Sequence, residues 1–260
     1  MEPVFGRYVM IGRVFHDTKG PRGSHVGMSM NDLGVLRGWT ASEVMEARGR
    51  VIFRDLDHFE RLRQSADSAG IDLSQIDLIA SGDLSARLGD LLERCAFEES
   101  VIHLHCTAGR TPDGWKPVGQ PQLYAAVFRL IRKDKPARLK TTPFRRSLAH
   151  IKRPEYFFGA VERYKVSKAG IYNDILYVDP ETGHILEGTG SNIFLVSSGK
   201  KSNKIVIAPP LEDSHGHTQV LDGITLKVIS ELVSSMSGWT FRSQNFTSSQ
   251  FLRYFIESGI

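Results

Sequence analysis

Two residues of this chain, Lys152 and Glu187, have side chains and surroundings that could do chemistry. Lys152 lies in the run HIKRPEYFFGAV, just before an expected helix, and a lysine amine can form a covalent bond to a carbonyl carbon. Glu187 comes 35 residues later and opens EGTGSNIF, where a turn leads into an apolar strand. A carboxylate at such a place can pair with a basic nitrogen. Taken singly, the two residues are also consistent with a solvated lysine and an ordinary turn glutamate.

Together the amine and the carboxylate indicate pyridoxal phosphate. The lysine would form a Schiff base with this cofactor, and the glutamate would keep the ring nitrogen protonated so that the ring can accept electrons. Two other patterns fail in the same region. Gly188–Asn192 lacks the Gly-x-Ser-x-Gly elbow of a serine hydrolase, and Ile193 stands where a dinucleotide-binding fingerprint needs glycine.

The segment from His150 to Val196 resembles the fold-type IV, or class IV, pyridoxal-phosphate enzymes. This family includes branched-chain aminotransferases, D-amino-acid aminotransferases and aminodeoxychorismate lyases. Its members share, in this order, a lysine, an aromatic or aliphatic helix, a glycine, a strand and a final motif. That motif reads Glu, three small residues, Ser or Glu, Asn, an apolar residue and Phe. The corresponding residues here follow in the same order and are Lys152, Tyr156, Gly170, Asp174–Val178 and Glu187–Phe194.

Two further motifs extend the resemblance to nearly the whole chain, from about Gly12 to Ile256. The run RVIFRDLDHFERLRQSADSAGI is similar to a family segment and puts Arg61 at the position of the arginine that grips the cofactor phosphate. The run VLDGITLKVI is similar to a family turn, where Ile224 and Thr225 would offer N–H groups and a hydroxyl to the same phosphate. A helix N-terminus suits an anion because its free N–H groups point outward and its dipole is positive there.

The resemblance implies an α+β chain with the two-domain fold-type IV architecture of the D-amino-acid aminotransferases. We expect residues 1–132 to form a smaller N-terminal domain, 133–143 an interdomain linker, and 144–260 a cofactor-binding domain with a shortened end. The cofactor is expected in the cleft between the domains. The resemblance also implies a homodimer, in which the Gly/Pro-rich loop Ala108–Gly119 reaches toward the partner's cofactor.

The function that the resemblance implies is amino-group transfer between a small amino acid and a 2-oxo acid. Lys152 would move a proton between the substrate α-carbon and the cofactor, and Tyr156 would hydrogen-bond the phenolic oxygen of the ring. Two alternatives stay open. One is β-elimination of the aminodeoxychorismate-lyase type, with the same lysine and pyruvate as product. The other is a non-catalytic relative that only binds pyridoxal phosphate.

The chain departs from the family at the residues that bind substrate. His103 stands at the position of the carboxylate-binding arginine of the branched-chain enzymes, and Asp113 at that of a later arginine of the D-amino-acid enzymes. The family's Phe-Glu pair is Ser42-Glu43, and Leu226 replaces the arginine after Gly-Ile-Thr. The sequence therefore specifies the cofactor more closely than the substrate.

Hydrophobic periodicity and turn residues predict the elements that position these residues. Asp55 or Asp57 is expected to cap a helix that ends at Gly70, and Pro154 suits the first turn of a helix that runs to Gly170. The other expected helices are Leu84–Cys95, Gly223–Ser235 and Ser248–Ile256. The expected strands are Val101–Cys106, Leu123–Ile131, Asp174–Val178, Asn192–Val196, Lys204–Ala208 and Trp239–Gln244.

The composition, 41% hydrophobic and 24% charged over 260 residues, fits a globular protein of one or two domains. Cys95 and Cys106 are too few for a disulfide framework, and no signal peptide is visible, so we expect a cytoplasmic location. No apolar run has the length of a membrane span.

Three groups of residues outside the motifs could also have a function. The basic residues between Arg129 and Arg146 are interpreted as a solvated linker, because they lie on no known nucleic-acid-binding scaffold. His103 and His105 would face the same side of a strand, but the sequence names no third or fourth ligand. The same holds for the loop that carries Asp213, His215 and His217, so no metal is expected.

Overall fold

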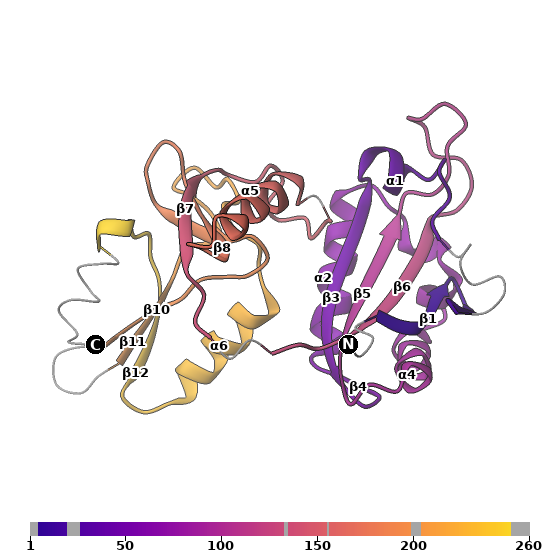
Figure 1. The fold of residues 1–260 in the computed structure, drawn as a ribbon, viewed down its shortest axis with the longest axis horizontal. Coiled ribbons are helices and arrows are strands. Elements are labelled where there is room, and N and C mark those ends of the chain that lie inside the picture. The colour runs from indigo at the N-terminus through magenta and orange to yellow at the C-terminus, as the bar shows by residue number, and fades with distance from the viewer. Residues whose placement is uncertain (1–4, 20–26, 133–134, 155, 199–203, 251–260) are drawn as a thin grey trace. The chain divides into compact units, whose positions relative to one another are not determined.

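The computed structural model describes residues 5–19, 27–132, 135–154, 156–198 and 204–250 (Figure 1). The chain divides into two compact units. The first comprises Met1–Lys133 and Ile151–Glu155, and the second comprises Asp134–His150 and Tyr156–Ile260. Each unit contains both helices and sheets, which confirms the expected α+β class.

The first unit is built on a six-stranded antiparallel sheet with the strand order β2-β1-β6-β5-β3-β4. Side chains alternate along β5, as the period of two of a strand requires. Ile102 and Leu104 are buried in the core, whereas His103 and His105 are only partly buried on the opposite face. The strands are β1 (Phe5–Ile11), β2 (Val14–Asp17), β3 (Thr40–Arg48), β4 (Val51–Ile52), β5 (Glu99–Thr107) and β6 (Gln122–Arg129).

Two helices cover the buried face of this sheet, α2 (Asp55–Ser68) and α4 (Leu84–Cys95). Leu62 of α2 and Leu88 of α4 belong to the same core cluster as Ile102 of β5. The structure thus confirms two helices at the positions that the spacing of apolar residues predicts. The described residues of the unit also form the helical segments α1 (Leu33–Arg37), the 3-10 turn η2 (Leu73–Gln75) and α3 (Asp77–Ala80).

The start of α2 differs from the expectation. Its N-cap is Arg54, in the left-handed conformation with φ 53°, and no side chain caps the helix. The expected caps, Asp55 and Asp57, lie instead in the first turn, where a negative charge interacts favourably with the helix dipole.

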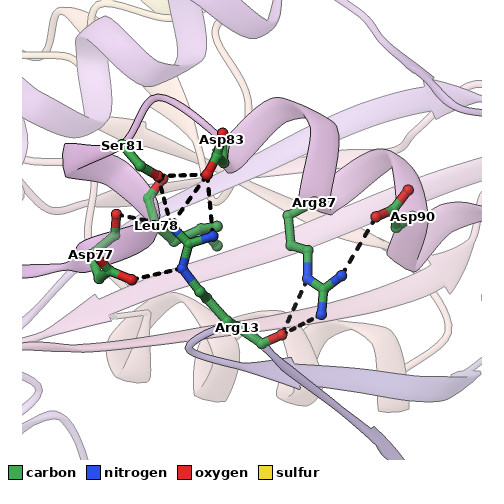
Figure 2. Close-up of polar contacts among 7 residues, drawn as sticks. All are labelled: Arg13, Asp77, Leu78, Ser81, Asp83, Arg87 and Asp90. Carbon is green, nitrogen blue, oxygen red and sulfur yellow. Dashed lines mark hydrogen bonds and ion pairs between the residues drawn. The ribbon is translucent and has the colours of Figure 1, made fainter.

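Arg13, in the turn between β1 and β2, ties that hairpin to the helical layer (Figure 2). Its Nε donates to Oδ2 of Asp77 at 2.7 Å and its Nη2 to Oγ of Ser81 at 2.7 Å. Arg87 of α4 donates from Nε to the carbonyl oxygen of Arg13 at 3.1 Å. The network is exposed, so each ion pair contributes little to stability, but together the contacts fix the position of the turn.

The second unit contains two three-stranded sheets, ordered β7-β8-β9 and β10-β11-β12. One core cluster joins Val166 of α5 to Tyr177 of β8, and a second joins Leu195 of β10 and Ile207 of β11 to Phe246. The elements are β7 (Leu139–Pro143), α5 (Phe157–Lys168), β8 (Asp174–Val178), β9 (Ile185–Gly188), β10 (Leu195–Ser198), β11 (Lys204–Ala208), α6 (Ile224–Ser235) and β12 (Trp239–Ser243).

Three segments of the second half differ from the sequence expectation. Part of the expected linker, Leu139–Pro143, is a strand that pairs in parallel with β8. Helix α5 begins at Phe157 rather than at Pro154. Strand β10 begins at Leu195 rather than at Asn192, because the Asn192 side chain holds the carbonyl oxygen of Leu221 in a turn.

Residues Ile151–Glu155 belong to the first unit, although we expected residues 144–260 to form one domain. The physical reason is that the backbone of Lys152 hydrogen-bonds to β3 and α2. The expected helix Ser248–Ile256 falls mostly outside the described residues. Its described part, residues 248–250, is helical. Among the described residues, no helix combines the length and the apolar character that crossing a bilayer requires.

Candidate functional site

Lys152 is held by its backbone against the first unit. Its N–H donates to Oγ of Ser65 in α2 at 3.0 Å, and its carbonyl oxygen accepts from the N–H of Ser42 in β3 at 2.8 Å. The residue is only 9% exposed. A lysine is almost never buried to this extent without a specific role or partner. These contacts fix the backbone of Lys152, whose side-chain amine is the group that the sequence indicates for covalent attachment to a carbonyl carbon.

Arg61 lies one helical turn before Ser65 on α2 and makes a two-pronged ion pair with Glu43 of β3. Its Nε donates to Oε1 at 2.8 Å and its Nη2 to Oε2 at 2.6 Å. His58 approaches the same carboxylate with Nδ1 at 2.7 Å from Oε2. Arg61 therefore stands on the helix that positions Lys152, and two of its nitrogens already bind a carboxylate.

Glu43 is fully buried, with an exposed fraction of 0%. Burial acts to raise the pKa of this carboxyl, but the hydrogen bonds and charges of Arg61 and His58 outweigh burial, so its pKa lies below the ordinary value. Glu43 is thus a charged, internally satisfied partner for Arg61. Sequence analysis named Glu43 only as one half of a departure from the family pattern.

Glu187, at the end of β9 in the second unit, is 5% exposed and has two hydrogen-bond donors. Arg146 donates from Nε to Oε1 at 2.6 Å, and the N–H of Leu221 donates to Oε2 at 3.2 Å. Arg146 also donates from Nη2 to the carbonyl oxygen of Ala149 at 3.0 Å. The carboxylate that we selected for a ring nitrogen is therefore buried and fixed in orientation.

Arg146 is the residue of this group that sequence analysis missed. It was placed in a solvated basic linker together with Arg145. Arg145 is not part of such a linker either, because its guanidinium pairs with Asp179 and Asp213. No periodicity or motif separates these two arginines from the exposed basic residues before them, so only the three-dimensional contacts could identify them.

The start of α6 forms a turn that lacks a side-chain cap. Its N-cap is Gly223, which has no side chain to cap the first turn, and that turn includes Ile224 and Thr225. Asn192 donates from Nδ2 to the carbonyl oxygen of Leu221 at 3.0 Å. A Cβ atom at Gly223 would lie 1.8 Å from Oδ1 of Asn192, so only glycine fits.

Leu221 connects the α6 turn to the carboxylate. Its N–H binds Glu187 and its carbonyl oxygen binds Asn192, so one residue joins both features. The second unit thus brings together a fixed carboxylate and an uncapped helix start. A carboxylate suits a ring N–H, and helix N–H groups suit a phosphate. The carboxylate and the helix N–H groups therefore fit the ring nitrogen and the phosphate of pyridoxal phosphate.

Tyr156 is the N-cap residue of α5 and lies in the same unit as Glu187. It is one of the groups that act on Tyr177, whose pKa is raised to about 12 mainly by burial, with smaller effects of nearby charges that include Glu187. The Tyr177 hydroxyl in turn packs against Gly159 of α5, where a Cβ atom would lie 2.1 Å from it. Tyr156 and Glu187 are therefore both close enough to Tyr177 to affect its pKa.

The six residues selected from the sequence fall into two groups. Lys152 and Arg61 lie in the first unit. The second unit contains Tyr156, Glu187, Ile224 and Thr225. Within the described residues, no group of three or more His, Cys, Asp and Glu side chains is arranged to hold a metal ion.

Comparison with known proteins gives matches over most of the chain. Residues 40–254 match the family model for amino-transferase class IV. The chain is 24% identical over 236 residues to the D-alanine aminotransferase of Bacillus licheniformis, covering 88% of this chain and 77% of that protein. It is 26% identical over 219 residues to a putative branched-chain-amino-acid aminotransferase of Methanocaldococcus jannaschii, covering 79% and 69% of the two chains.

Solved structures show the same fold. The branched-chain aminotransferase of Thermoproteus uzoniensis, determined with norvaline, superposes with a TM-score of 0.78 at 18% identity and covers 95% of this chain and 81% of its own. A hypothetical aminotransferase from Mycobacterium tuberculosis, in its PLP-bound form, superposes with a TM-score of 0.75 at 17% identity, with 94% and 84% covered. These similarities confirm the expected fold-type IV architecture.

Proposed function

Because this chain belongs to the class IV aminotransferase family, whose cofactor is pyridoxal phosphate, we propose that it transfers the amino group between a small amino acid and a 2-oxo acid, with Lys152 as its catalytic lysine. The observation that carries the proposal is the burial of Lys152 together with the two backbone hydrogen bonds that fix it to Ser42 and Ser65. A catalytic amine must be held in position by rigid elements, and β3 and α2 meet that requirement.

When bound, pyridoxal phosphate supplies a carbonyl carbon for covalent attachment and a ring that accepts electrons from the substrate α-carbon. Lys152 provides the amine for that attachment. When not attached to the cofactor, the same amine would take the proton from the substrate α-carbon as a general base and deliver it to the cofactor carbon C4′ as a general acid. The hydrogen bonds to Ser42 and Ser65 fix the backbone from which this amine extends.

Glu187 is proposed to hold the proton of the ring nitrogen. Its Oε1 is bound by Arg146 and its Oε2 by the N–H of Leu221, so each oxygen has one fixed donor and remaining lone pairs. Tyr156 is proposed to bind the phenolic oxygen of the ring. Both side chains would act by orienting the ring and its charge, because neither is expected to exchange protons with the substrate.

The phosphate is proposed to bind at the start of α6, through the N–H groups of Ile224 and Thr225 and the hydroxyl of Thr225. The support is the uncapped first turn and the lack of room for a side chain at Gly223. Arg61 remains a proposed second anchor. Its two hydrogen bonds to Glu43 mean that a phosphate would have to share or displace that partner.

A homodimer is part of the proposal, with the loop Ala108–Gly119 as the segment that reaches the partner's site. The loop is fastened at its base, because Thr111 donates its N–H to Asn31 and Gly109 accepts from the N–H of Leu33, each at 2.9 Å. Its tip presents Trp115, which is 69% exposed and has the Arg37 guanidinium 4.1 Å from its ring centroid. An exposed tryptophan on a fixed base suits a contact with a partner surface.

The test is a half-reaction with a broad panel of D- and L-amino acids, followed by the absorbance of the bound cofactor and by oxo-acid formation. The wild type should convert at least one amine, and Lys152→Ala should convert none, while Lys168→Ala, at an exposed lysine of α5, should behave as wild type. Pyruvate release without any oxo-acid acceptor would favour the lyase. A bound cofactor without conversion of any amine would contradict the proposed enzyme.

A further inference from the structure

Asn192 makes two different contacts with the turn that precedes α6. Its Nδ2 donates to the carbonyl oxygen of Leu221 at 3.0 Å. Its Oδ1 lies against Gly223, where a Cβ atom would be only 1.8 Å from that oxygen. The main chain from Leu221 to Gly223 therefore bends around the end of one side chain, and both polar atoms of the amide contact it.

The same bend joins the two groups that are proposed for the two ends of the cofactor. Leu221 donates its N–H to Oε2 of Glu187 at 3.2 Å, and Gly223 is the N-cap of α6. On one side Asn192 thus contacts the residue that binds the carboxylate. On the other side it contacts the residue that begins the helix. All of these residues belong to the second unit.

The segment from Glu187 to Asn192 is itself closely folded. The N–H of Gly188 donates to the carbonyl oxygen of Ser191 at 2.7 Å, and a Cβ atom at Gly188 would lie 2.6 Å from Oγ of Ser191. This compact turn restricts the spacing between the Glu187 and Asn192 side chains. The contacts therefore connect Glu187 to Leu221, Leu221 to Asn192, and Asn192 back to Glu187 along the turn.

An asparagine suits this place because its amide is neutral and has both a donor and an acceptor. A carboxylate of the same shape could not donate to the carbonyl oxygen of Leu221, and it would add a negative charge beside the proposed phosphate position. The absence of a Cβ atom at Gly223 lets the amide approach the main chain closely. Asn192 and Gly223 are therefore complementary in chemistry and in shape.

A ligand with two recognised ends gains affinity when the partners of those ends are held at the right separation. After one end has bound, the other end binds in an intramolecular event, so the whole ligand binds more tightly than its parts. The gain is lost when the separation can vary, although each part can still bind its own partner. Glu187 has a second hydrogen bond, from Arg146, that does not depend on Asn192.

We infer that Asn192 is a positioning residue, which fixes the separation between Glu187 and the start of α6 so that both ends of one cofactor molecule are bound together. The inference rests on the proposed function, because that function assigns the ring nitrogen to Glu187 and the phosphate to α6. Asn192 acts through the main chain of Leu221 and Gly223. Its loss should therefore affect the whole cofactor more than either part of it.

The experiment measures binding to the apoprotein by calorimetric titration, with three probes that have no aldehyde and so cannot react with Lys152. Deoxypyridoxine phosphate carries the pyridine ring and the phosphate. Deoxypyridoxine is the pyridine ring alone, and inorganic phosphate is the other end alone. The wild type should bind deoxypyridoxine phosphate at least about a hundredfold more tightly than either part. Equal affinity for the whole probe and for one of its parts would overturn the inference.

Two variants remove the contacts of Asn192, and a third is the matched control. Asn192→Ala removes both contacts, whereas Asn192→Leu removes the donor but keeps a side chain of similar shape. Both should weaken deoxypyridoxine phosphate about ten- to a hundred-fold and change the affinity for each part by less than about threefold. Asn173 also binds main chain, because its Oδ1 accepts from the N–H of Arg138 at 2.7 Å, but it lies on an exposed turn. Asn173→Ala should bind all three probes as the wild type does.

A purely structural role of Asn192 would give a different pattern. A general loss of order would weaken the whole probe and both parts by the same factor, and that result would overturn the inference. If Asn192→Ala does not fold, Asn192→Leu decides between the two patterns.

The inference and the proposed function fail in different ways. If the loaded wild type converts amino acids but the variants weaken all three probes equally, or none of them, the inference is overturned and the function stands. If the variants selectively weaken deoxypyridoxine phosphate but the loaded wild type converts no amine, the function is overturned and the positioning role stands.

Discussion

Arg146 donates a hydrogen bond from Nε to Oε1 of Glu187 at 2.6 Å, and the two side chains are only 10% and 7% exposed. A buried ion pair of this kind is costly to break, because removing one partner leaves the other charge uncompensated in the interior. The pair comes from a loop before α5 and from β9, segments 41 residues apart. The ion pair therefore stabilises the tertiary structure and also holds Glu187 in one orientation.

The first prediction concerns the contribution of this ion pair to the stability of the fold. Arg146→Ala should lower the free energy of unfolding by about 3–5 kcal/mol, as is typical when one partner of a buried pair is removed. The matched control is Arg163→Ala, because Arg163 forms a partly exposed pair with Asp174 at 3.5 Å and should contribute about 0–1 kcal/mol. Urea unfolding of both variants measures the difference. Similar losses for the two arginines would contradict the structural account.

The second prediction concerns the role of Glu187 in turnover. Glu187→Gln keeps the shape and an oxygen acceptor for Arg146, so the variant should still bind pyridoxal phosphate. It should lose turnover by at least about a hundredfold, or ~2.7 kcal/mol, because a neutral partner stabilises a protonated ring nitrogen poorly. Exposed Glu181 provides the control Glu181→Gln. Turnover in Glu187→Gln at the wild-type rate would rule out the proposed pairing.

The third prediction concerns the turn before α6. Gly223→Ala should weaken pyridoxal-phosphate binding, because the new Cβ atom would meet the Asn192 amide and move the helix start. In an Asn192→Ala background the same change should cost less, since the obstructing side chain is gone. Gly27→Ala, where a Cβ atom meets nothing within 4 Å, is the control. Cofactor titration would contradict the account if Gly223→Ala and Gly27→Ala bind equally well.

The fourth prediction is a pH dependence of stability from Glu43. The folded-state pKa of Glu43 is lowered, so its stabilising contribution is present above the unfolded pKa of about 4.3 and is lost as pH falls through the folded pKa. Glu43→Gln should therefore be less stable near neutral pH and should lose less stability on acidification. Glu98→Gln, at an exposed pair with Arg48, should follow the wild-type acid limb. Parallel acid limbs for wild type and Glu43→Gln would refute the assignment.

Local sequence signals predicted several elements closely. The helix Leu84–Cys95 and the strands Asp174–Val178 and Lys204–Ala208 have the predicted bounds, because their apolar spacing and flanking turn residues are consistent with each other. By contrast, Leu139–Pro143 reads as polar and proline-bounded, and it becomes a strand only because β8 offers a parallel partner. Tertiary pairing therefore overrides local propensity at that segment.

The sequence predicted those residues of the candidate site that belong to a motif. It did not predict the residues that are defined only by a tertiary contact. The motifs marked Lys152, Glu187 and the turn before α6, and the structure shows that these residues are held by specific hydrogen bonds. The partners themselves, Arg146 for Glu187 and Glu43 for Arg61, lie 41 and 18 residues away. No motif marks Arg146, and Glu43 belongs to a family pair that does not indicate Arg61 as its partner. Ion pairs between distant segments depend on the fold, so a single sequence cannot specify them.

The central claim is that Lys152 is the residue to which pyridoxal phosphate attaches, and borohydride reduction tests it most directly. The enzyme is loaded with the cofactor, reduced, digested and mapped by mass spectrometry. The account predicts that the cofactor mass appears on the peptide that contains Lys152, and that Lys152→Ala acquires no modification while Lys168→Ala is modified at Lys152 as in the wild type. Modification of a different lysine in the wild type, or of none, would contradict the account.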